Sequence, residues 1–165
     1  MERERINLEV AWRAHAAQES WAGKVDTKAS ILLALNGLIL GAMLSARIQK
    51  DSFVQVLSGP RLTMLAVAVV LCAVAALLAA AVVFPVLGGR RGGAGGTIFF
   101  GDLRRRDPAE LAAQLLGLTV PGQVEQVARQ LVAMSRANWL KHLLMQAALT
   151  ATMIGFLLVM VVVLT

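Results

Sequence analysis

The chain has 165 residues, of which 58 % are apolar and 16 % charged, and its mean hydropathy is +0.69. This composition excludes an ordinary soluble domain and favours a membrane protein. The formal net charge of +6 suits a surface that meets anionic lipid headgroups or an anionic ligand.

Residues 1–28 predict a cytoplasmic amphipathic helix. Apolar side chains recur there at steps of three and four, at Ile6, Val10, Ala14, Ala17, Trp21 and Val25. Only Gly23 weakens the helical pattern before Gly37, and one helical glycine costs about 1 kcal/mol. We therefore expect one continuous helix that runs into the first membrane span.

Three windows without charged residues are long enough to cross a bilayer, and they predict transmembrane helices at residues 29–46, 62–88 and 142–165. The first contains Gly37 and Gly41 in a Gly-x-x-x-Gly spacing, with Asn36 beside them. Small residues allow close helix approach and a buried amide needs a partner. These three residues indicate either helix packing within one protomer or a homo-oligomer interface.

Residues 47–61 form a predicted outer loop, and residues 89–141 a cytoplasmic segment. The latter begins with the glycine-rich stretch GGRRGGAGG, which lacks the Gly-Lys-Ser/Thr ending of a phosphate-binding loop and indicates a linker. After an FFGD turn, Asp107 and Pro108 predict the start of a short helix, and Pro121 opens a last helix that continues into the third span. The predicted fold is an all-α membrane protein, with three transmembrane helices and a small cytoplasmic helical bundle built from extensions of spans one and three.

Basic residues near the span ends predict the orientation. The N-terminal segment carries five, the 47–61 loop three, and the long segment up to residue 141 eight. The positive-inside rule then puts the N-terminus and the long segment in the cytoplasm and the C-terminus outside the inner membrane.

The sequence offers no recognisable catalytic or metal-binding arrangement. The single Cys72 lies within a predicted span, and neither His15 nor His142 has acidic or thiol residues at ligand spacing. We expect a protein that is not an enzyme and holds no metal or cofactor.

The stretch WAGKVDTKAS, residues 21–30, carries the main functional signal. On a helix Trp21, Lys24 and Lys28 share one face, and Asp26 sits on another flank. An aromatic plane beside two ammonium groups suits a small anionic ligand with a flat ring, such as a nucleotide. The alternative is that tryptophan and lysine serve only as anchors at the membrane surface.

Phe99 and Phe100 present the same choice. They follow the glycine-rich linker and precede three arginines, so they indicate either an element that dips into the membrane or a second wall for a ligand ring.

The order of these motifs resembles the membrane effectors of bacterial Pycsar antiphage systems. The resemblance rests on W-x-x-K-x-D-x-K-A-S before an apolar span with Asn-Gly, on FFGD after the second span, and on Q-V-x-x-Q-L-x-x-x-S before Lys141 and the last span. It covers nearly the whole chain. Family members usually have Lys-Tyr where Lys141 is followed by His142, and this chain contains no tyrosine.

The resemblance implies binding of a cyclic pyrimidine mononucleotide, cyclic CMP or cyclic UMP, made by a partner cyclase during phage infection. It also implies that the effector then impairs the inner membrane, so that the cell dies before the phage matures, and it implies no nucleic-acid partner. Carried onto this sequence, the ligand-binding residues are Trp21, Lys24, Asp26, Lys28, Phe99, Phe100, Arg136 and Lys141. Two other functions stay open: a small membrane scaffold without a signal, and a holin-like pore that needs no ligand.

Overall fold

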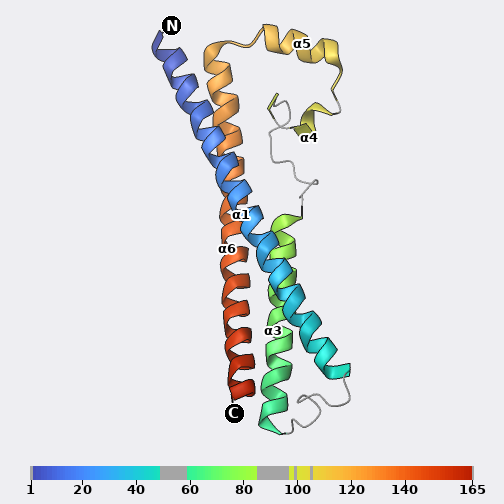
Figure 1. The fold of residues 1–165 in the computed structure, drawn as a ribbon. Helices are drawn as coiled ribbons and strands as arrows, with labels where there is room; N and C mark the ends of the chain where they lie inside the picture. The colour runs from blue at the N-terminus through green and yellow to red at the C-terminus, as the bar shows by residue number, and fades with distance from the viewer. Residues whose placement is uncertain (1, 49–58, 85–96, 99, 105, 165) are drawn as a thin grey trace. The chain divides into compact units, whose positions relative to one another are not determined.

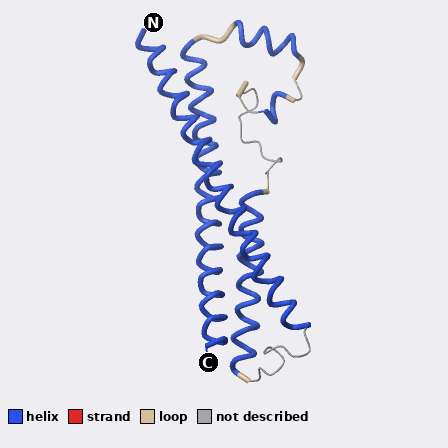
Figure 2. Tube along the Cα trace, viewed as in Figure 1, coloured by secondary structure: helices blue, strands red, loops and turns tan. Residues whose placement is uncertain are grey.

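The computed structural model describes residues 2–48, 59–84, 97–98, 100–104 and 106–164. Over these residues the secondary structure is helical, without a strand (Figure 2). Three helices are long and apolar enough to cross a membrane, namely α1 (Glu2–Ile48), α3 (Pro60–Val83) and α6 (Val120–Leu164). The predicted all-α fold with three membrane-spanning helices is thereby confirmed.

Helix α1 is continuous over 47 residues, so the predicted N-terminal helix and first span form one element. Helix α6 is likewise continuous over 45 residues. It begins beside Thr119, whose Oγ1 accepts a hydrogen bond from the Gly122 amide at 3.3 Å and so caps the first turn. Both helices thus join polar segments to apolar ones without a break.

Helix α3 ends earlier than its apolar window does. The window runs past residue 84, but the helix stops at Val83, and Phe84 adopts an extended conformation with φ −60° and ψ 125°. Pro85 follows, and a proline disfavours helical geometry in the residue before it. Residues 85–88 of the predicted span lie outside the described residues.

Two short helices precede α6. Helix α4 covers Phe100–Leu103 in the FFGD motif, and α5 covers Pro108–Leu116. Asp107 accepts hydrogen bonds from the amides of Ala109 at 2.8 Å and Glu110 at 3.2 Å. This is the N-cap that the sequence predicted for the short helix.

The chain divides into two compact units, to which α1 and α6 both contribute (Figure 1). We call Lys24–Phe84 with Lys141–Thr165 the membrane unit, and Met1–Gly23 with Pro85–Leu140 the polar unit. In the membrane unit α3 packs on α1 and α6 through small residues, with Ala29, Ala68, Cys72, Ala75, Ala79 and Ala148 completely buried. Small side chains let helix backbones approach closely, which favours packing in lipid.

Candidate functional site

An ion pair joins α1 to α6 where their apolar segments begin. In the membrane unit the Lys141 Nζ lies 2.5 Å from the Asp26 Oδ1, and the two side chains are 28 % and 38 % exposed. A partly exposed pair of this kind is worth about 1 kcal/mol. The sequence analysis proposed both residues as ligand contacts, but it did not predict an ion pair between them.

Apolar packing fixes the position of this pair. Val25 and Ala29 form a buried cluster with Val82, and Leu144 packs against it. Asp26 directly follows Val25, and Lys141 precedes Leu144 by one helical turn. The pair therefore lies at the edge of the membrane unit's core, where a change in its bonding acts on the contact between α1 and α6.

Lys24 and Lys28 are exposed and stand one turn apart on α1. Within the described part of the chain, no hydrogen bond or ion pair joins either ammonium group to another residue. Like charges at this spacing repel each other, and an anion between them relieves the repulsion. Since Lys141 already neutralises Asp26, these lysines give this end of the membrane unit an excess of positive charge.

In the polar unit, Trp21 is 57 % exposed on α1, and Arg136 is exposed on α6. Here α6 is tied to α1 by the Asn138 side chain, whose Nδ2 donates to the Gln18 carbonyl oxygen at 3.2 Å. Phe99 lies outside the described residues, and the structure describes Phe100 only as the first residue of α4. Trp21 is thus more than half exposed, and its role in stacking on a ligand ring stays a prediction.

The polar unit contains buried polar groups that the sequence analysis did not predict. Two acceptor oxygens, Gln18 Oε1 and Asp102 Oδ2, are buried without a hydrogen-bond donor among the described residues. His15 is 8 % exposed, packs edge-on against Trp12 at a centroid distance of 5.5 Å, and faces Glu19 at 3.8 Å. Buried acceptors are normally satisfied by water or a ligand. The FFGD motif contains Asp102, but no pattern in the sequence indicates that its oxygen is buried.

The residues predicted for helix packing or an oligomer interface separate into two environments. Asn36 is completely buried, and its Nδ2 donates at 2.9 Å both to the Leu32 carbonyl oxygen and to Thr152 Oγ1 of α6. Gly37 and Gly41 are exposed, and a Cβ atom built on either would meet nothing within 4 Å. Asn36 therefore packs inside the protomer, whereas the two glycines face outward.

A metal site requires several ligating side chains close together. Among the residues described, no three His, Cys, Asp or Glu side chains come together in a way that could hold a metal ion. The exposed ammonium groups of Lys24 and Lys28 can hold an anion, and Asp26 and Lys141 are paired with each other.

One comparison with known proteins decides the family. The model of the Pycsar effector protein domain (PycTM) matches residues 10–165, nearly the whole chain. The chain belongs to the Pycsar effector protein family. No curated protein and no solved structure matches it.

Membership in the PycTM family makes this chain an antiphage effector that works in a membrane and responds to a signal from a partner cyclase. The family is not a known enzyme class. The matched range includes Trp21, both exposed lysines and the Asp26–Lys141 pair, and it leaves out the first turns of α1.

Proposed function

We propose that this PycTM protein binds a cyclic pyrimidine mononucleotide, cyclic CMP or cyclic UMP, at the cytoplasmic end of its helices and then impairs the inner membrane. The observation that supports this proposal is the family match over residues 10–165, which contains two free ammonium groups on one turn of α1. A cyclic nucleotide carries one phosphate charge and a flat base. The phosphate suits the lysines of the WAGKVDTKAS stretch, and the base suits its tryptophan.

In this proposal Lys24 and Lys28 bind the phosphate. Trp21, one turn earlier on the same helix, stacks on the base, or Phe99 and Phe100 do so. Arg136 or Lys141 adds a further positive charge, and Asp26 accepts a hydrogen bond from the base or the ribose. His142 follows Lys141 where family members usually have a tyrosine. A ligand contact that depends on this tyrosine is therefore lost or replaced in this chain.

The Asp26–Lys141 pair provides the coupling to the membrane. In the structure the two groups pair with each other at 2.5 Å. Where Lys141, rather than Arg136, supplies the further positive charge and Asp26 accepts from the base or ribose, the bound nucleotide competes with the ion pair for both groups. Both residues lie on helices that continue into membrane spans, so loss of the pair releases α1 from α6 at the bilayer surface. A ligand shifts such an equilibrium by its difference in affinity for the two arrangements.

Breaking this pair without ligand should raise the basal leak of the membrane. We expect Asp26→Asn and Lys141→Gln each to shift the resting equilibrium about fivefold toward the active form, because each removes about 1 kcal/mol of resting-state stabilisation. The measurement is dye-reported depolarisation of expressing cells without phage or nucleotide, corrected for the amount of protein in the membrane fraction.

A double-mutant cycle provides the control for this prediction. The Asp26→Asn/Lys141→Gln protein should leak no more than either single variant, because both remove one interaction. The exchanged pair Asp26→Lys/Lys141→Asp should return the leak toward the wild-type level. Basal depolarisation that is unchanged in both single variants would exclude the pair as a restraint.

A binding scan tests the proposed ligand directly. Detergent-solubilised protein is titrated with cyclic CMP, UMP, AMP and GMP, and we expect saturable binding of one of the two pyrimidine nucleotides. A protein that binds none of the four, yet is stably inserted, would be a scaffold. A protein whose expression alone depolarises cells as strongly as infection does would be a ligand-independent pore.

A further inference from the structure

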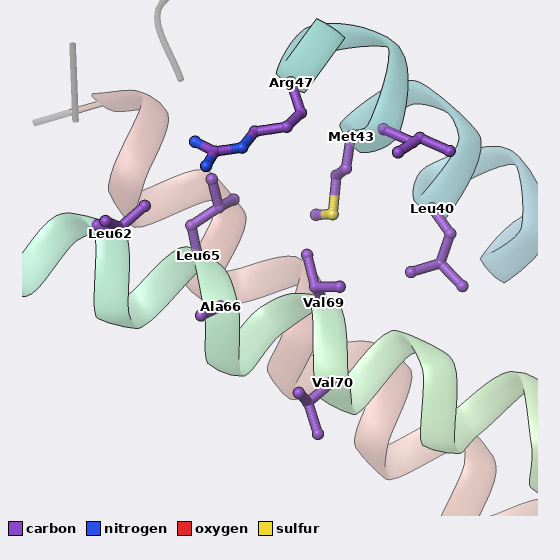
Figure 3. Close-up of a pocket in the computed structure, with 9 residues that line it drawn as sticks. Leu40, Met43, Arg47, Leu62, Leu65, Ala66, Val69 and Val70 are labelled. Atoms are coloured by element: carbon purple, nitrogen blue, oxygen red, sulfur yellow. The ribbon is translucent and has the colours of Figure 1, made fainter. Parts of the chain in front are cut away.

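At the opposite end of the membrane unit, α1 and α3 enclose an open apolar cavity of about 430 Å³ (Figure 3). Its walls include Leu40 and Met43 from the last turns of α1 and Leu65, Ala66 and Val69 from the first turns of α3. Among the described residues that line it, Arg47 alone carries a charge. We refer to this cavity as the Arg47 groove.

The position of Arg47 along α1 relates the groove to the bilayer. Residues 29–46 carry no charge, so Arg47 is the first charged residue after the apolar part of the helix. An arginine there keeps its guanidinium at headgroup depth while its aliphatic stem lies along apolar surface. Figure 3 shows this side chain extending from α1 across the mouth of the groove toward Leu65 of α3.

From Arg47 the groove follows the helix inward to Leu40. Seven residues at about 1.5 Å each make this roughly 10 Å, which is most of one leaflet's share of a hydrocarbon core about 30 Å thick. The groove is thus open and apolar, and its depth matches a large part of the length of an acyl chain. The Arg47 guanidinium lies at its mouth, at the depth of a lipid phosphate.

We propose that the Arg47 groove binds an anionic phospholipid, with one acyl chain between α1 and α3 and the headgroup phosphate on the Arg47 guanidinium. Charge complementarity favours this occupant over a second copy of the chain, because a second copy's apolar helix would offer Arg47 no anion in exchange for water. Basic pockets between transmembrane helices commonly hold anionic headgroups. This lipid site is separate from the nucleotide site and does not depend on it.

The test compares phosphatidylglycerol with phosphatidylcholine of identical chains, titrated onto the detergent-purified full-length protein and followed by native mass spectrometry. We expect the wild type to bind phosphatidylglycerol about five- to tenfold more tightly, the preference that one well-placed cation provides. Arg47→Gln should bind the two lipids equally. Arg61→Gln removes the same charge from the start of α3, outside the lining of the groove, and should keep the preference.

A second variant tests the apolar part of the site. Ala66 is exposed on α3, so Ala66→Phe fills the groove without crowding the core, and it should weaken binding of both lipids. Equal binding of the two lipids by the wild type, or a preference lost as fully in Arg61→Gln as in Arg47→Gln, would overturn the proposal. So would an Ala66→Phe protein that keeps its lipids and loses its dimers in crosslinking, since the occupant would then be a second copy.

Discussion

Gly155→Ile is expected to destabilise the membrane unit more than the same substitution at Gly37 or Gly41, the exposed glycines of α1. A Cβ atom on Gly155 would lie 3.1 Å from the Sγ of Cys72, 3.3 Å from the carbonyl oxygen of Ala68 and 3.4 Å from the Cβ of Leu71. The Ala68 oxygen belongs to the α3 backbone and cannot turn aside as a flexible side chain can. An isoleucine therefore forces α6 away from α3, at a cost of about 3 kcal/mol.

The measurement is the apparent melting temperature of the detergent-purified protein, together with its yield in the membrane fraction. Gly155→Ala adds only the Cβ atom, so its melting temperature should lie between those of the wild type and Gly155→Ile. The matched control is Gly37→Ile on α1, where a Cβ atom would meet nothing within 4 Å among the described residues. Equal melting temperatures for the two isoleucine variants would contradict a tight contact at Gly155.

Gly37→Ile also tests the oligomer that the first span predicts. Gly37 and Gly41 are exposed, and a Cβ atom on either meets nothing within 4 Å among the described residues, so we expect an isoleucine at Gly37 to act on a neighbouring molecule. If these glycines form a homo-oligomer interface, the variant keeps its melting temperature and loses the assembled fraction in crosslinking. An unchanged assembled fraction would mean that this face meets lipid.

The helices could be predicted from the sequence because their signals are local. The charge-free windows, the cap at Asp107 and the proline at 121 each act within a few residues, and the elements they predict are present. The early end of α3 could also have been predicted, because Pro85 disfavours helical geometry in the residue before it.

Contacts between helices could not be predicted from local sequence patterns. The Gly-x-x-x-Gly spacing pointed to Gly37 and Gly41. Among the described glycines, however, the one that packs closely against another helix is Gly155, which has no motif around it. A buried partner for Asn36 was expected, but nothing in the sequence identifies Thr152, 116 residues away. The Asp26–Lys141 pair spans 115 residues in the same way. Which faces of two helices meet depends on the third helix, and no periodicity contains that information.

The largest functional effect is expected from Lys24→Gln/Lys28→Gln. Glutamine is one atom shorter than lysine and has a similar helix propensity, but it removes both charges that would face the nucleotide phosphate. Loss of a charge-assisted contact costs about 1.5–3 kcal/mol, so each lysine accounts for a factor of roughly ten to more than a hundred in affinity. Both side chains are exposed, and the protein should insert and fold normally. We expect nucleotide binding and phage-triggered depolarisation to disappear while membrane abundance stays unchanged.

Two further variants separate a ligand site from a membrane anchor. Arg3→Gln/Arg5→Gln removes two exposed positive charges from the same helix, outside the residues that match the family, and should keep the response. Lys24→Arg and Lys28→Arg keep the charge that attracts anionic headgroups but replace a compact ammonium with a broad planar group. A ligand site built around point charges should lose affinity in both, whereas an anchor accepts arginine. A normal response in the paired glutamine variant would show that these lysines only hold α1 at the bilayer surface, and the phosphate would then have to bind Arg136 or Lys141.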